Sequence, residues 1–157
     1  MEDDEYKRIL AKMCSLCARG EKCEFDIIQK LTKLEVDNES QQKIIEYLVS
    51  NSFINNQRYA NAFVNDKFKF NKWGKQKIKQ NLKFKRIESI YIDASLSSLD
   101  NGDYKKVLVY VLEKKRKQIK DKDELIVRQK LLNHAVSKGF EMDLIFEIIT
   151  THNLSQI

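Results

Sequence analysis

Hydrophobic residues recur at intervals of three and four along almost the whole chain, and short polar breaks separate the runs. This spacing places hydrophobic side chains on one face of a helix. It predicts about nine helices. Eight of them have both ends predicted: about Asp3–Ala18, Lys22–Leu34, the capping pair Asp37-Asn38 to Ser50, Gly74–Lys85, Glu88–Leu99, Asp103–Gln118, Asp121–Lys138 and Glu141–His152. The remaining helix, fourth in the chain, is expected to begin after Asn55.

Residues that interrupt helices are scarce in this chain. Proline is absent from the 157 residues, and glycine occurs four times. Strong helix formers fill the intervals, and alternating runs typical of strands are few. The sequence therefore predicts an all-α protein without a sheet.

A hydrophobic triplet with spacings of four and five residues occurs three times. Its three copies are Ile27, Leu31, Val36; Ile78, Leu82, Ile87; and Leu131, Ala135, Phe140. The pattern predicts three tandem three-helix repeats over residues 1–52, 53–101 and 102–157. Each repeat would bury its hydrophobic face on its neighbour, which gives an elongated, bowed molecule.

The positive charge is unevenly distributed. Residues 1–50 carry 8 Lys/Arg and 11 Asp/Glu, whereas the remaining residues carry 21 and 12. The segment from Lys67 to Arg86 holds nine Lys/Arg and no acidic residue, with aromatic and aliphatic residues between the charges. A folded basic surface of this kind suits a polyanion or an acidic protein partner.

Two basic groups stand out, and each has a simpler interpretation. Lys75, Lys79 and Lys83 form a stripe beside the predicted core face, with no acid in their own segment; the alternative is a solvated face. A second group, Lys114 to Lys117 with Lys120, closes a predicted helix, where lysine also interacts favourably with the helix dipole. Trp73 either packs the start of its helix onto the core or contacts a partner.

Several classes of function find little support. The two histidines, His134 and His152, lie near the C-terminus, and the glycines are too far apart for a phosphate-binding loop. Cys14, Cys17 and Cys23 lack an evident fourth zinc ligand, so we interpret them as small core residues. We expect no enzyme activity, cofactor or metal. No hydrophobic run approaches the ~18 residues that a membrane span needs, so we expect no membrane span. The N-terminus is acidic, unlike a signal peptide, and the odd cysteine count argues against a disulfide framework. We therefore expect a cytoplasmic protein with reduced thiols.

Three stretches resemble the RecX family, bacterial regulators of the RecA recombinase. They are Phe53-Ile54-Asn55-Asn56-Gln57-Arg58-Tyr59-Ala60 followed by Phe63-Val64, Trp73-Gly74 with Ile78 and Leu82, and Gln129-Lys130-Leu131 with Lys138-Gly139-Phe140 and Ile145. The first third matches more loosely, and its cysteines are unlike many members. Lys85-Arg86-Ile87 stands where the family often has Lys-Gly-Ile, which predicts a different turn there.

The resemblance implies tandem three-helix repeats and a non-enzymatic role. Family members bind the RecA filament on single-stranded DNA and typically inhibit strand exchange and the coupled ATP hydrolysis. The first hypothesis is therefore a monomeric modulator of RecA, with inhibition as the expected direction, that lies in the filament groove with its basic face toward phosphates or acidic recombinase. The alternatives are a free-standing helical DNA-binding protein and a general interaction scaffold.

The charge pattern and the resemblance together give the candidate contact residues. These are Arg58, Lys67, Lys69, Lys72, Trp73, Lys75, Lys77, Lys79, Lys83, Lys85, Arg86, Lys114, Lys115, Arg116, Lys117 and Lys120. Lysine predominates among them, which favours phosphate contact over reading of base edges.

Overall fold

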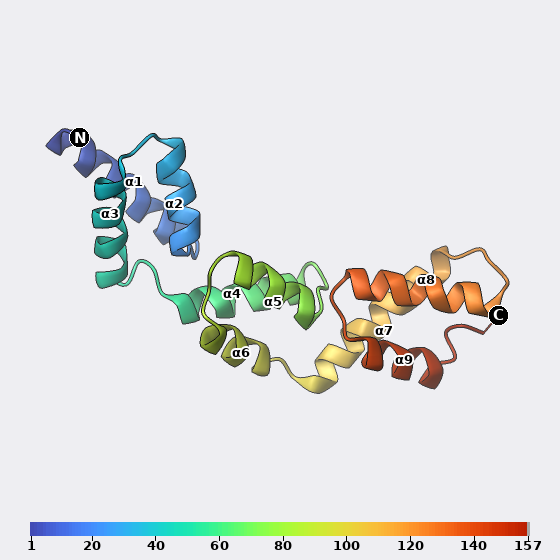
Figure 1. Cartoon of the computed structure of the whole chain (residues 1–157). Helices are drawn as coiled ribbons and strands as arrows, with labels where there is room; N and C mark the ends of the chain where they lie inside the picture. Colours follow the sequence, from blue (N-terminus) through green and yellow to red (C-terminus); the bar gives the residue numbers. More distant parts are fainter. Residues whose placement is uncertain (157) are drawn as a thin grey trace. The chain divides into compact units, whose positions relative to one another are not determined.

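The computed structural model describes residues 1–156, which form nine α-helices and no strand (Figure 1). The all-α prediction is therefore confirmed for these residues. The helices are α1 (Asp3–Arg19), α2 (Glu24–Lys33), α3 (Asn38–Ser50), α4 (Asn56–Lys69), α5 (Lys75–Phe84), α6 (Ser89–Ser97), α7 (Asn101–Gln118), α8 (Glu124–Ser137) and α9 (Met142–Thr151).

Aspartate side chains fix the start of three of these helices. Asp37 accepts a hydrogen bond from the backbone N–H of Ser40, as the capping pair predicted. Asp100 caps α7 in the same way, so α7 begins two residues earlier than predicted. Asp123 caps α8, which consequently begins three residues later than predicted, and Asp121 precedes the helix.

The three predicted triplets are all buried, and each ends in the same turn. The backbone N–H of Val36, Ile87 and Phe140 donates to the carbonyl five residues earlier, at 3.1 Å in all three cases. The preceding residues Glu35, Arg86 and Gly139 have φ values of 57°, 61° and 97°. This is the helix-terminating turn that places one residue in the left-handed region and buries the next. The different turn predicted at Arg86 is therefore wrong, because arginine adopts the same conformation as the glycine.

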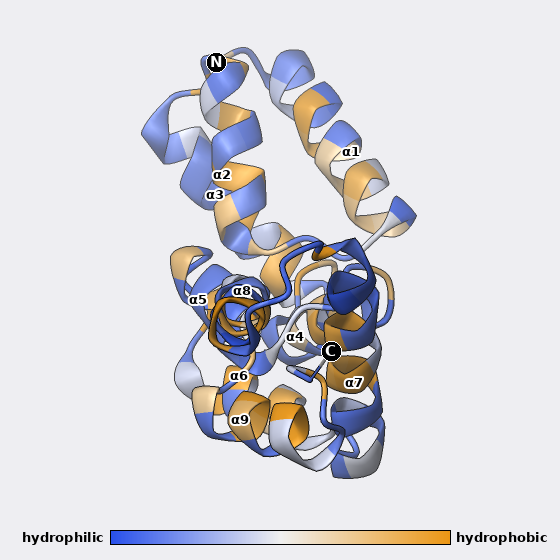
Figure 2. Cartoon of the chain, turned by 90° about the vertical axis from the view of Figure 1, so that its right-hand side faces the viewer, coloured by the Kyte–Doolittle hydropathy of each residue, from blue (hydrophilic) through white to orange (hydrophobic). Residues whose placement is uncertain are grey.

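The chain divides into two compact units, which are described separately. Unit 1 comprises residues Met1–Ala62 and Leu82–Ile92. Its core gathers hydrophobic residues of α1, α2 and α3, and α3 packs against both other helices. Figure 2 shows hydrophobic and hydrophilic segments alternating along α1, as expected for a helix with one buried face.

Unit 2 comprises Phe63–Asn81 and the residues from Asp93 onward. Helices α7, α8 and α9 pack against one another in this unit (Figure 1). Phe140 is fully buried, and its ring centroid lies 5.2 Å from that of Tyr104. The Tyr104 hydroxyl accepts from the backbone N–H of Lys75 and donates to Glu141, so a buried aromatic pair anchors the start of α5.

Two glycines of unit 2 allow close backbone contact. The Gly74 N–H donates to the carbonyl of Lys138 at 2.8 Å, and the Gln76 N–H donates to the carbonyl of Gly139 at 3.0 Å. A Cβ atom on Gly74 would lie 2.3 Å from the carbonyl carbon of Gly139. Gly74 is thus required by the close approach of another backbone segment.

The two boundaries between the repeats, after residues 52 and 101, and the elongated shape stay predictions.

Candidate nucleic-acid interface

Trp73 lies between two lysines in unit 2 and forms the Trp73 cluster with Lys67 and Lys77. The Nζ atoms of Lys67 and Lys77 lie 4.9 and 4.5 Å from its ring centroid. The ring also meets Phe63 edge-on at 6.5 Å, so Trp73 packs against α4 while remaining partly exposed. Cation–π contact holds the two ammonium groups at fixed places without neutralising them.

A second aromatic residue is flanked in the same way. Tyr110 of α7 is half exposed, and the Nζ atoms of Lys72 and Lys114 lie 5.9 and 6.0 Å from its ring centroid. We call Lys72, Tyr110 and Lys114 the Tyr110 cluster. Both lysines were predicted as contact residues from the sequence, but the tyrosine was not. The four-residue spacing from Tyr110 to Lys114 on one helix was the available signal.

The stripe on α5 is less uniform than predicted. Lys75 lies over the Tyr104 ring, 4.8 Å from its centroid, and Lys79 forms an ion pair with Asp93 of α6 at 3.6 Å. The expectation of a stripe without an acidic partner is therefore wrong at Lys79, because its partner comes from another helix. Lys83 is exposed and belongs to unit 1.

Lys85 and Arg86 surround Phe25 in unit 1. The Lys85 ammonium donates to the carboxylate of Asp26, and both residues face the Phe25 ring at less than 6 Å. Burial alone would raise the pKa of Asp26, but the hydrogen bond and the charge of Lys85 outweigh burial and lower it. Lys85 therefore contributes to stability and is less available to a partner than its exposed neighbours.

We expect Lys85→Met to destabilise the chain at pH 7, with a difference from the wild type that shrinks in acid. A carboxyl whose folded pKa is depressed stabilises the fold above its unfolded pKa of about 3.9, and this stability is lost as the pH falls through the folded value. Urea denaturation of both chains from pH 7 to pH 3 measures the difference. A constant difference across this range would show that Lys85 acts through packing alone.

Two arginines among the candidates hold backbone carbonyls. Arg58 donates to Glu21 and to the carbonyls of Ser52 and Phe53, which closes the turn between α3 and α4. Arg116 donates to the carbonyls of Leu154, Ile119 and Gln156. These contacts give both guanidinium groups a structural function, independent of any partner.

The remaining candidates are exposed lysines. The side chains of Lys69, Lys83, Lys117 and Lys120 are all exposed. The structure thus groups Lys67, Lys72, Trp73, Lys75, Lys77, Lys79 and the α7 lysines in unit 2, and places Arg58, Lys83, Lys85 and Arg86 in unit 1.

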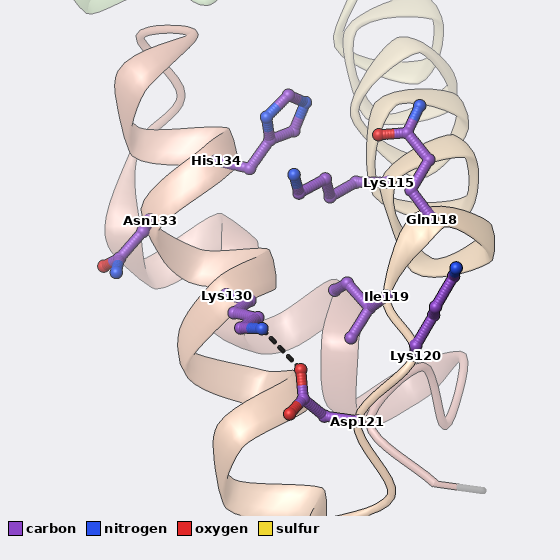
Figure 3. Close-up of a pocket in the computed structure, with 8 residues that line it drawn as sticks. All are labelled: Lys115, Gln118, Ile119, Lys120, Asp121, Lys130, Asn133 and His134. Carbon is purple, nitrogen blue, oxygen red and sulfur yellow. Dashed lines mark hydrogen bonds and ion pairs between the residues drawn. The ribbon is translucent and has the colours of Figure 1, made fainter.

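Two neighbouring hollows between α7 and α8 share Lys115, Gln118 and His134. The larger, of about 610 Å³, also includes Lys120, Asp121 and Lys130 (Figure 3). Figure 3 shows Lys115 reaching across from α7 towards His134 of α8, while Lys130 pairs with Asp121. Burial and the charges of Lys115 and Lys138 lower the pKa of His134, because each of them disfavours the charged imidazolium.

The cysteines and histidines gather no metal site in the part of the chain described. Cys23 is buried, and Cys14 and Cys17 pack at the edge of the unit 1 core. Among residues 1–156 no group of three or more His, Cys, Asp or Glu side chains is placed to hold a metal ion. No helix in this range is long and hydrophobic enough to cross a membrane.

Comparison with known proteins gives consistent matches. Residues 55–96 match the family model "RecX, second three-helix domain", and residues 103–149 match "RecX, third three-helix domain". The Regulatory protein RecX of Clostridium beijerinckii is 31% identical over 150 residues, which span 94% of this chain and 70% of that protein. The Clostridioides difficile protein of the same name is 28% identical over 149 residues, 95% of this chain and 70% of its own length.

Solved structures agree on the fold. The crystal structure of RecX from Lactobacillus salivarius superimposes with a TM-score of 0.82 at 21% identity, covering 98% of this chain and 99% of that one. A second crystal structure, of a regulatory protein RecX, gives a TM-score of 0.84 at 22% identity and covers 94% of this chain and 72% of that one.

Proposed function

We propose that this chain, which belongs to the RecX family, regulates a RecA recombinase without catalysing a reaction itself. It binds the recombinase filament on single-stranded DNA along the groove, through the basic side chains of unit 2. Inhibition of the filament's ATP hydrolysis is the expected direction. The observation that carries the proposal is the family match across both the second and third three-helix domains.

The lysine–aromatic clusters support a nucleic-acid or filament contact. The Trp73 and Tyr110 clusters combine four ammonium groups with two partly exposed rings. Exposed rings beside cations suit single strands, because every base offers a face for stacking and every nucleotide a phosphate. The absence of a neutralising carboxylate on these four lysines among the described ion pairs leaves their charge for a partner.

ATP hydrolysis by the cognate RecA on single-stranded DNA tests the proposal. We expect the rate to fall as the chain is added, and the chain to sediment with the filament. RecA without DNA and the chain without RecA are the controls. An unchanged rate without co-sedimentation would contradict the proposal. Binding to bare DNA in that case would favour the free-standing DNA-binding protein instead.

A further inference from the structure

The smaller α7–α8 hollow has an unusual charge composition. It has a volume of about 230 Å³ and is lined by Lys72, Lys114, Lys115 and Lys138 together with Tyr110 and His134. No acidic side chain is among its described lining residues. Lysines from the α4–α5 turn, α7 and α8 therefore converge on one place without a carboxylate to balance them, which raises the positive potential there.

Internal hydrogen bonds use only part of the donor capacity of these lysines. Lys72 donates to the carbonyl of Lys69 at 2.6 Å, and Lys138 donates to the carbonyl of Asn71 at 3.1 Å. An ammonium group has three donors, so each keeps further donors after these bonds. The two bonds hold the ammonium groups at the hollow in advance, which reduces the ordering cost of binding an anion.

We propose that this hollow binds a phosphate of single-stranded nucleic acid, with the adjacent base stacked on Tyr110. The inference deepens the proposed function and rests on it, since it names one contact of the chain with the strand. Lysine binds phosphate as a point charge, and the half-exposed Tyr110 ring lies beside two of the lysines. A free phosphate offers no base to the half-exposed Tyr110 ring, so a strand, which brings a phosphate and a base together, fits the site better.

His134 provides a direct spectroscopic readout of the site. A bound phosphate favours the charged imidazolium, so the pKa of His134 should rise when the site is occupied. Protonation of His134 and binding of the strand are then linked. The affinity for the strand therefore increases as the pH falls from the His134 pKa of the bound chain towards the His134 pKa of the free chain. The other charged groups facing His134 are Lys72, Lys114, Lys115 and Lys138, with Lys120, Asp121 and Lys130 in the adjoining hollow.

The first experiment follows the imidazole C2–H resonances by NMR titration. The chain has two histidines, and the exposed His152 at the end of α9 serves as the internal reference. We expect an oligothymidylate to shift the titration of His134 and to leave that of His152 in place. Inorganic phosphate at the same phosphate concentration should produce no shift. An equal shift with inorganic phosphate, an equal shift of both histidines, or no shift would each overturn the proposal.

The second experiment measures oligothymidylate affinity by fluorescence anisotropy. Tyr110→Leu should weaken binding at least about fivefold, because one base loses its stacking partner. Tyr47→Leu is the matched control, since Tyr47 is similarly exposed and lies on α3. Lys114→Gln with Lys115→Gln should also weaken binding, whereas Lys105→Gln with Lys106→Gln removes the same charge from α7 outside the hollow. The proposal would be overturned if Tyr47→Leu weakened binding as much as Tyr110→Leu. It would also be overturned if the Lys105/Lys106 double variant weakened binding as much as the Lys114/Lys115 double variant.

These experiments distinguish failure of the Tyr110 stacking site from failure of the proposed regulation of RecA. If wild-type chain inhibits RecA while Tyr110→Leu retains full affinity for the oligonucleotide, only the stacking site fails. If the site binds the oligonucleotide as described while RecA is unaffected, only the proposed function fails.

Discussion

Gly74→Ala is expected to destabilise the chain by about 3 kcal/mol or more, at the upper end of the cost of overpacking. The new Cβ would lie 2.3 and 2.4 Å from the carbonyl carbon and oxygen of Gly139, and 2.4 Å from the backbone nitrogen of Phe140. These are backbone atoms, so no side-chain rotation relieves the overlap. The two segments must separate, which also lengthens the hydrogen bonds of Gly74 and Gln76 to the turn after α8.

Urea denaturation and thermal melting followed by circular dichroism measure this effect. The melting temperature should fall by roughly 6–12 °C, given ~2–4 °C per kcal/mol for a chain of this size. Gly20→Ala is the matched control, because nothing lies within 4 Å of its added Cβ. A melting temperature of Gly74→Ala within 2 °C of that control would show that the two backbones do not approach so closely.

Local sequence signals were sufficient to predict the helices and the buried triplets. The triplets Ile27, Leu31, Val36 and Leu131, Ala135, Phe140 were predicted from spacing alone, because helical period and burial are encoded within about ten residues. Arg86 shows the limit of this method. A non-glycine residue at the turn predicted another conformation, yet the hydrogen bond to Leu82 and the burial of Ile87 impose the left-handed one.

The candidate site was only partly predictable, because its electrostatics depend on residues distant in sequence. Charge density drew attention to the basic segment but not to Asp93, which pairs with Lys79 from the next helix. It also missed Lys138 and His134, which join Lys72 at one hollow although more than sixty residues separate them. Arg58 and Arg116 were chosen for their charge, whereas the structure gives them carbonyl partners.

Lys67→Glu combined with Lys77→Glu is expected to abolish most binding to single-stranded DNA. Each of these lysines lies within 5 Å of the Trp73 ring centroid and is outside every ion pair recorded for residues 1–156. If each contacts one phosphate, the slope of log affinity against log salt should fall by ~1.4, at ~0.7 per contact. The same relation predicts roughly a twentyfold loss of affinity at 0.1 M salt.

The double variant Lys7→Glu, Lys43→Glu is the matched control. It changes the net charge by the same amount as the Lys67/Lys77 variant, but at two lysines that already pair with acidic side chains. Lys7 pairs with Asp3 and Lys43 with Glu39, and each pair is exposed and lies within one helix, so reversal there costs only a few tenths of a kcal/mol in stability. Its affinity should stay near the wild-type value after correction for net charge. Equal losses in both double variants would show that binding responds to overall charge and not to the Trp73 cluster.

The same pair of variants separates contact with DNA from contact with the recombinase. Phosphate contacts of Lys67 and Lys77 predict parallel losses on bare single strands and on the filament, with a flatter salt dependence in both. Contacts with acidic side chains of the recombinase predict a loss on the filament alone, because the bare strand then never meets these two lysines. Since cation–π contact with Trp73 fixes both ammonium groups, Trp73→Leu should reproduce part of whichever loss is observed without changing the charge.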